Sequence, residues 1–171
     1  MWSRKAWTAA VAGLALLALG ACGFKPVYDT RGADGQAVMT ALHHLTVAPI
    51  PNRAGVRLRS ELDRLFSPHV APSTYTVHIK LDVKSRVTAI EQDTSVRRRN
   101  IHLDAEVRLV PAGGLITMPE FQTRVRSNAG AEQLPSDFST LVSEGAAEQR
   151  AVELLAQRIR QQLALHFAQK G

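Results

Sequence analysis

Two segments of the chain alternate between apolar and polar residues. In residues 75–89 the odd positions are apolar, with Ser85 as the one exception, and the even positions are polar. Residues 100–110 repeat this pattern, with apolar side chains at the odd positions from Ile101 to Leu109. Successive side chains of a strand point to opposite faces of a sheet. Both segments are therefore predicted to be long strands with one face on a core and the other in water.

Two other segments have the period of an amphipathic helix. In residues 56–66 one helical face carries Leu58, Leu62, Leu65 and Phe66. Pro68 follows and ends this helix. A longer helix is predicted for residues 136–169, with a stripe made of Val152, Leu155, Ile159, Leu163 and Phe167. Gly145 costs this helix about 1 kcal/mol relative to alanine, so a kink or a split would fall there.

The remaining segments complete a mixed fold. Residues 45–50 read as a short strand bounded by Pro49 and Pro51, residues 120–127 as a weaker strand, and residues 23–44 as mostly irregular. Each helix must bury its stripe, and each strand offers one apolar face. We therefore predict an α+β fold, a four-stranded, mostly antiparallel mixed sheet with two helices packed on one face. The first strand, helix and strand would form a parallel crossover, and the other strands would be linked as hairpins.

The beginning of the chain has the parts of a secretory signal peptide. Arg4 and Lys5 precede an uncharged, largely apolar run over residues 6–21, which is shorter than the roughly 20 residues of a typical membrane-spanning helix. The run ends in Leu19-Gly20-Ala21-Cys22, which resembles the bacterial lipobox. We expect cleavage before Cys22, a diacylglyceryl group on its thiol and an acyl group on the new amino terminus. The alternative is an ordinary signal peptide or an uncleaved anchor, with the cysteine incidental.

These expectations divide the chain into three parts. Residues 1–21 are a signal peptide that is removed, residues 22–44 a lipidated tether, and residues 45–171 a single α+β domain. Gly23, where an aspartate would retain a lipoprotein in the inner membrane of enteric bacteria, favours the outer membrane. The predicted location is therefore the periplasmic leaflet of the outer membrane, with the acyl chains on Cys22 as the anchor. No other cysteine remains for a disulfide.

The net charge of the chain indicates which classes of partner it could bind. The formal charge is +6 at pH 7, and cleavage of the signal removes Arg4 and Lys5 from it. A modest basic excess suggests anionic partners, without choosing among nucleic acid, lipid phosphate and acidic protein. Export from the cytoplasm argues against nucleic acid.

The clearest candidate binding residues are four arginines near the tip of the predicted hairpin. Arg97, Arg98 and Arg99 are consecutive, and Arg86 lies on the preceding strand. Guanidinium groups bind phosphate and carboxylate through paired, charge-assisted hydrogen bonds. Strand alternation would aim Arg98 away from its two neighbours unless the ladder frays or bulges. The alternative is a solvated turn in which Glu91 and Asp93 pair with the arginines, and such exposed pairs contribute only about 0–1 kcal/mol.

The chain carries no motif typical of an enzyme or a metal site. It has no GxSxG, HExxH or P-loop sequence, and the adjacent His43 and His44 lack further ligands at metal spacing. His78 and His102 fall on outward faces of the two long strands. We therefore expect neither catalysis, nor a metal, nor a cofactor beyond the covalent acyl groups on Cys22.

The start of the mature chain, Cys22-Gly23-Phe24-Lys25-Pro26-Val27-Tyr28, resembles that of the LptE family of lipopolysaccharide-assembly lipoproteins. The order of elements is similar as well, from the short strand and Arg/Leu-rich helix to the final helix ending in QLALHF. The resemblance implies two helices on a four-stranded sheet. It also implies a protein that plugs the LptD outer-membrane β-barrel, helps that barrel assemble and binds lipopolysaccharide.

The resemblance assigns lipopolysaccharide contact to basic residues between the second and third strands. Arg97, Arg98 and Arg99 hold that position here, while Arg158 and Arg160 of the last helix have weaker claims. Another periplasmic binding lipoprotein, such as a phospholipid-transport accessory or a peptidoglycan-binding module, is the alternative function. An enzyme with scattered carboxylates has little support.

Overall fold

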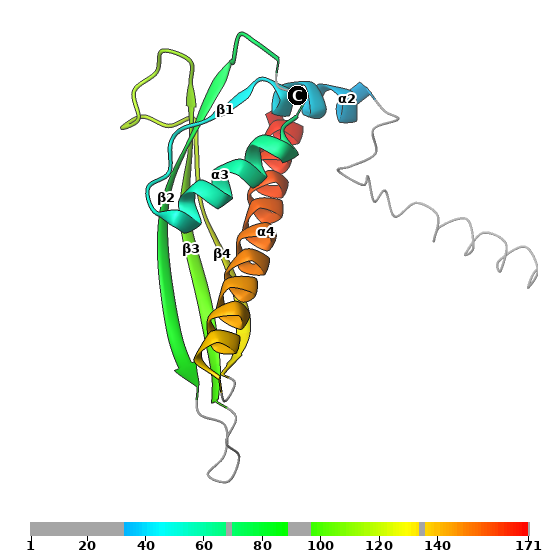
Figure 1. Cartoon of the computed structure of the whole chain (residues 1–171). Helices are drawn as coiled ribbons and strands as arrows, with labels where there is room; N and C mark the ends of the chain where they lie inside the picture. Colours follow the sequence, from blue (N-terminus) through cyan, green and yellow to red (C-terminus); the bar gives the residue numbers. More distant parts are fainter. Residues whose placement is uncertain (1–32, 68–69, 89–96, 134–135, 171) are drawn as a thin grey trace, which may run out of the picture.

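The structure is a computed structural model that describes residues 33–67, 70–88, 97–133 and 136–170. A sheet lies on one side and the long last helix runs along it (Figure 1). In chain order the elements are α2 (Ala33–His43), β1 (Leu45–Val47), α3 (Arg53–Leu65), β2 (Tyr75–Thr88), β3 (Arg97–Pro111), β4 (Phe121–Gln133) and α4 (Asp137–Lys170).

The sheet has the mixed topology expected from the sequence. Its strand order is β1-β2-β3-β4, with β1 parallel to β2 and the other neighbours antiparallel. Helix α3 connects the two parallel strands, because a parallel pair needs a long crossover connection. The α+β fold with a four-stranded mixed sheet is therefore confirmed.

The alternation of the sequence sets which face of the sheet is buried. Val77 and Ile79 of β2, and the odd positions of β3 from Ile101 to Leu109, are buried. The even positions of β3, such as His102 and Asp104, lie half-buried on the other face. Helix α4 packs along β4 and β3, and α3 packs against α4 and β1. Both helices thus cover the same face, and the opposite face, here called the outer face, carries the polar side chains.

The long last helix is confirmed and continuous. The predicted stripe of Val152, Leu155, Ile159, Leu163 and Phe167 is buried. The helix runs through Gly145 without a split. Its buried side chains all follow this position, and ahead of it Ser143 and Glu144 contact Glu132 and Arg99 of the sheet. None of the helices in the described ranges is long and apolar enough to cross a bilayer.

Two expectations about secondary structure were wrong. Residues 33–43, expected to be irregular, form helix α2, so the described residues form three helices. Val38 and Leu42, one helical turn apart, are buried in the same core as α4, and this packing stabilises a helix too short to show a clear period. Strand β4 continues to Gln133, beyond residue 127, because its inner face there carries small residues, including Ser127 and Ala131, where α4 lies close.

The domain has two distinct ends (Figure 1). At the α2 end lie α2, the β3–β4 loop of residues 112–120 and the last turn of α4. Backbone hydrogen bonds link these parts, from Thr74 N to His44 O at 2.9 Å and from Ala112 N to Thr74 O at 2.8 Å. At the hairpin end lie the end of β2, the start of β3 and the first turns of α4.

Candidate functional site

The outer face of the sheet is covered by charged and polar side chains in register. Across the three long strands, Asp82, Asp104 and Arg126 form one row. Lys80, Glu106 and Arg124 form the row on one side of it. Lys84, His102 and Asn128 form the row on the other side. Because α3 and α4 lie on the opposite face, nothing among the described residues covers these side chains.

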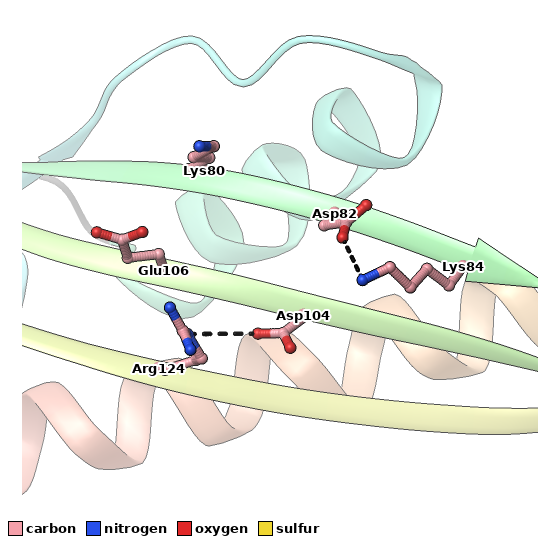
Figure 2. Close-up of a pocket in the computed structure, with 6 residues that line it drawn as sticks. All are labelled: Lys80, Asp82, Lys84, Asp104, Glu106 and Arg124. Atoms are coloured by element: carbon pink, nitrogen blue, oxygen red, sulfur yellow. Dashed lines mark ion pairs between the residues drawn. The ribbon is translucent and has the colours of Figure 1, made fainter.

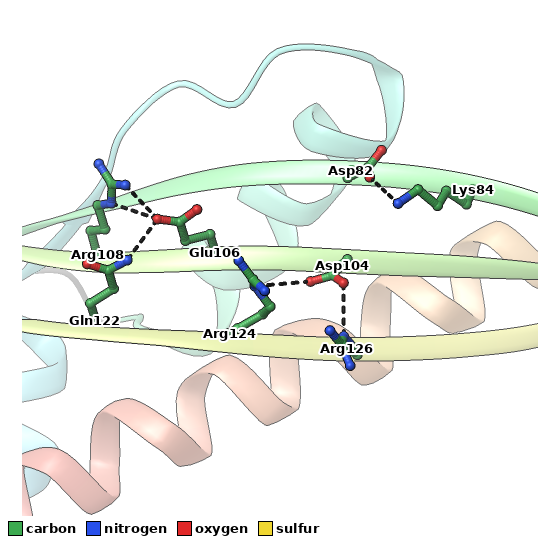
Figure 3. A network of polar contacts seen from close by, with 8 residues as sticks. All are labelled: Asp82, Lys84, Asp104, Glu106, Arg108, Gln122, Arg124 and Arg126. Atoms are coloured by element: carbon green, nitrogen blue, oxygen red, sulfur yellow. Dashed lines mark hydrogen bonds and ion pairs between the residues drawn. The ribbon is translucent and has the colours of Figure 1, made fainter.

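Ion pairs organise the middle of the outer face (Figure 3). Glu106 Oε1 accepts hydrogen bonds from Arg108 Nη2 at 2.6 Å and from Gln122 Nε2 at 2.8 Å. Asp104 lies between two arginines, with Arg126 Nε 2.9 Å and Arg124 Nε 3.9 Å from its carboxylate oxygens. The hydrogen bond from Arg108 holds the pKa of Glu106 below its usual value of 4.5. Glu106 and Asp104 are thus neutralised by arginines beside them on the sheet.

The surface is hollowed at two neighbouring places on this face. The first hollow, of about 270 Å³, is lined by three basic and three acidic side chains (Figure 2). In it Asp82 pairs with Lys84 at 2.8 Å, and the hydrogen bond from Lys84 lowers the pKa of Asp82. Because cations and anions are matched there, this hollow has little preference for an anionic ligand.

The second hollow lies toward the hairpin end and is basic. We call it the basic groove; its volume is about 430 Å³, and it is lined by Lys84, Arg86, His102, Leu103, Asp104, Arg126, Ser127, Asn128 and Arg158. Of the described residues that line it, Asp104 is the single carboxylate, against four cationic side chains and a histidine. The cations come from β2, β4 and α4. This arrangement suits a ligand with several anionic groups.

Helix α4 contributes to the groove by reaching over the edge of the sheet. Arg158 Nη1 donates a hydrogen bond to the carbonyl oxygen of Arg126, and Arg150 Nη2 donates one to Gly130 O at 3.1 Å. These bonds occupy carbonyl groups of β4, which is an edge strand. Arg158 is thereby fixed beside Arg126.

The structure separates the four arginines singled out by the sequence. Arg86 is exposed and lines the basic groove. Arg99 instead forms an ion pair at 2.8 Å with Glu144 of α4. Arg97 and Arg98 begin β3, and the ladder with β4 runs through all three positions without a bulge. The side chains of Arg97 and Arg98, the loop at 89–96 with Glu91 and Asp93, and Cys22 lie outside the described residues.

Sequence reasoning missed part of the basic groove. The sequence placed Lys84 and Arg126 on outward strand faces without assigning them to a site. It gave Arg158 only a weak claim to contact lipopolysaccharide. The missing information was the register of β3 with β4, which places Asn128 opposite His102 and Arg126 opposite Asp104. His102 was expected on the outward face, and it lies there. Among the described residues no three His, Cys, Asp or Glu side chains come together as a metal site.

Apolar side chains lie exposed at the same end as the groove. Phe138, Leu141 and Val142 of α4 are 75%, 67% and 56% exposed. Spacings of three and four residues put them on one ridge of the helix, here called the apolar ridge. These exposures show that α3 leaves the ridge uncovered; the ion pair of Arg57 of α3 with Glu148, at 3.2 Å, lies farther along α4.

Comparison with solved structures identifies the class of fold. A protein from Caulobacter crescentus CB15 described as a lipoprotein superposes with a TM-score of 0.65 at 18% identity, over 78% of this chain and 97% of its own. A minor lipoprotein from Acinetobacter baumannii matches with a TM-score of 0.48 at 12% identity, over 71% and 92% of the two chains. Lipoprotein B from Nitrosomonas europaea matches with a TM-score of 0.47 at 16% identity, over 70% and 79%. The first of these shares the α+β fold described here.

The family follows from the sequence itself. The profile of the LptE family, described as lipopolysaccharide-assembly, matches residues 42–163. The chain therefore belongs to the LptE family, and this membership supports a role in lipopolysaccharide assembly. The resemblance noted from the sequence is confirmed. A search of curated proteins gives no match to this chain.

Proposed function

We propose that this chain is an outer-membrane lipoprotein that fills the lumen of the LptD β-barrel, helps that barrel assemble and binds lipopolysaccharide. Acyl groups on Cys22 anchor it to the periplasmic leaflet. The role requires no catalytic residue. Family membership supports the proposal as a whole, and the basic groove is the observation that carries lipopolysaccharide binding.

The hairpin end combines the two kinds of contact that an acylated, phosphorylated sugar needs. The basic groove offers the guanidinium groups of Arg86, Arg126 and Arg158, which form strong hydrogen bonds to phosphate. The apolar ridge of α4 offers hydrophobic surface to acyl chains. Glu132 N donates to Ser143 Oγ at 3.2 Å, which joins the end of β4 to the helix that carries the ridge. Groove and ridge are therefore held in one rigid end.

The exterior of the domain suits the lumen of a barrel. The interior of an outer-membrane barrel is polar, so a plug needs a wet surface over a compact core. The outer face provides rows of charged side chains across three strands. The core lies between the other face of the sheet and the helices. The long sheet and the long α4 give an elongated body (Figure 1).

The binding proposal is tested by neutralising the groove. Arg86→Gln combined with Arg126→Gln removes two cations from it, and we expect affinity for purified lipopolysaccharide to fall about tenfold or more, as for lost charge-assisted bonds. Arg53→Gln combined with Arg59→Gln makes the same charge change on exposed positions of α3 and serves as the control. Unchanged thermal unfolding would show that both variants fold. Equal affinity of the groove variant and the control would contradict the proposal.

The consecutive arginines have a separate test. Charge reversal of Arg97, Arg98 and Arg99 to glutamate is expected to weaken lipopolysaccharide binding without unfolding the domain. A triple variant that binds as well as the parent would remove these three residues from the site and leave the basic groove as the candidate.

A further inference from the structure

A second exposed apolar surface lies at the α2 end. Leu115, Ile116 and Met118 of the β3–β4 loop are 66%, 48% and 75% exposed. We call these three residues the loop patch. Residues 112–119 contain no charged side chain, so the loop exposes apolar groups to water without a charge beside them in the sequence.

Hydrogen bonds give the β3–β4 loop a defined conformation. Gly114 N donates to Pro111 O at 2.9 Å, Met118 N to Leu115 O at 3.0 Å and Glu120 N to Leu109 O at 2.9 Å. At the end of the loop, Glu120 accepts a hydrogen bond at 2.6 Å from Lys170 in the last turn of α4. The loop is thus held in two successive turns, and its apolar side chains stay on the surface.

The loop patch lies on the same end as the point where the tether joins the domain. Val70 N donates to His43 O at 2.8 Å, and the chain of bonds from His44 through Thr74 to Ala112 leads from α2 to the loop. Helix α2 begins at Ala33, eleven positions after Cys22, so an extended tether reaches at most about 40 Å. Strand β3 alone, with 15 residues, is about 50 Å long.

The reach of the tether and the length of the sheet determine which end of the domain faces the lipid. If the hairpin end faced the membrane, the α2 end would stand about 50 Å from the lipid, the length of β3. A tether of about 40 Å could not span that distance, so acylated Cys22 could not reach the membrane. The hairpin end also carries acidic side chains next to the apolar ridge, including Asp137 and Glu144. The uncharged loop patch is exposed apolar surface at the end of the domain where the tether joins it.

We propose that, while the domain is not yet enclosed by a barrel, the loop patch inserts into the bilayer leaflet that holds the acyl chains of Cys22. The inference rests on the proposed acylation. Leu115, Ile116 and Met118 enter the boundary between headgroups and acyl chains, and the domain stands with its hairpin end away from that leaflet. The lipid anchor and the loop patch together form two membrane contacts, and two contacts fix the orientation of the domain where a single flexible tether would not.

Tryptophan fluorescence provides a clean test. The only tryptophans, Trp2 and Trp7, precede Cys22, so the mature protein has none. Met118→Trp introduces one tryptophan at a position that is 75% exposed, and the control Val56→Trp introduces one on α3 at a position that is 65% exposed. The acylated proteins are purified from membranes and reconstituted in vesicles of phosphatidylethanolamine and phosphatidylglycerol, with or without brominated acyl chains.

We expect brominated lipid to reduce the emission of Met118→Trp about twofold, because interfacial side chains lie roughly 5–10 Å deep, and to leave Val56→Trp unchanged. Leu115→Trp should behave like Met118→Trp. Equal emission with and without bromine at both loop positions would overturn the inference, whether the loop then contacts water, a protein partner or a second copy. Intact mass separates the two proposals: acylated protein without quenching rejects only the loop patch, whereas protein without acyl mass rejects the anchor and the inference with it.

Discussion

Glu120 and Lys170, fifty positions apart, meet in a hydrogen bond of 2.6 Å between Glu120 Oε1 and Lys170 Nζ. Lys170 also donates to the hydroxyl of Tyr75 at 2.8 Å, and His166 Nε2 lies 3.4 Å from Glu120 Oε1. The contact joins the β3–β4 loop to the last turn of α4 and to the start of β2. The hydrogen bonds that Lys170 donates to Glu120 and Tyr75 raise the pKa of Lys170 to about 12, and the bond from Lys170 lowers the pKa of Glu120.

The first prediction concerns the pH range in which this contact stabilises the domain. Because the pKa of Glu120 is lower in the folded state than its usual value of 4.5, the stabilisation is complete above about pH 4.5. It is lost as the pH falls through the lowered pKa. At the alkaline side it is lost as the pH rises from the usual pKa of Lys170, 10.5, through about 12. Glu120→Gln should therefore unfold at a lower temperature than the parent at pH 7.

The same variant has a matched control. Glu61→Gln removes a carboxylate whose partner, Arg64, lies one turn away on α3, and it should leave the β3–β4 loop unchanged. In Glu120→Gln, amide hydrogen exchange in the last turn of α4 should speed up several-fold. A difference in melting temperature between parent and Glu120→Gln that persisted at pH 2 would contradict the assignment.

The second prediction compares two glycines in helices. A Cβ at Gly55 would lie 2.6 Å from Ile50 Cγ2 and 3.0 Å from Ile50 O, and buried Ile50 has no room to move. Gly55→Ala should destabilise the domain by about 1–3 kcal/mol. A Cβ at Gly145 meets nothing within 4 Å, so Gly145→Ala should stabilise α4 by about 0.5–1 kcal/mol. Urea unfolding of both variants measures the two changes, and a shift of the same sign in both would refute the packing described.

The third prediction concerns Ser127, a buried polar side chain beneath α4. Its hydroxyl donates to Ala151 O at 2.7 Å, which connects β4 directly to the helix backbone. Ser127→Ala should cost about 1 kcal/mol in the free energy of unfolding. Ser85→Ala, at an exposed position of β2, is the control and should change little. If the two variants were equally stable, the hydrogen bond to Ala151 would contribute nothing.

The fourth prediction uses the ion pair between Arg99 and Glu144. With both side chains partly exposed, the coupling energy in a double-mutant cycle should be about 0–1 kcal/mol. If Arg99 also binds an anionic ligand, Glu144 competes for it. Glu144→Gln should then tighten lipopolysaccharide binding, whereas Glu153→Gln, farther along α4, should not. If Glu144→Gln does not tighten binding, Arg99 does not bind the ligand and has a purely structural role.

The alternation of apolar and polar residues was sufficient to predict most of the fold. A one-residue shift of β3 would move Leu103 and Val107 from the core into water, so the buried face follows from the sequence. The same logic holds for the stripe of α4, whose residues Leu155 and Ile159 are fully buried. These elements are long, and their signals come from many positions.

Short or small-residue segments could not be predicted in this way. Helix α2 depends on the burial of Val38 and Leu42 against distant residues. The second half of β4 buries Ser127 and Ala131, which carry no strong apolar signal. The basic groove depends on the register of three strands and on Arg158 reaching over a strand edge. Only the arginines near the hairpin tip were visible in sequence, because they are consecutive or nearly so.

The most direct test of the proposed function is to purify the acylated protein from native outer membranes and identify what accompanies it. The account predicts a mature chain that begins at Cys22 with acyl mass, bound in equal amounts to an LptD barrel and accompanied by lipopolysaccharide. A protein without acyl mass, or one that purifies with peptidoglycan or a phospholipid transporter and without a barrel, would contradict it.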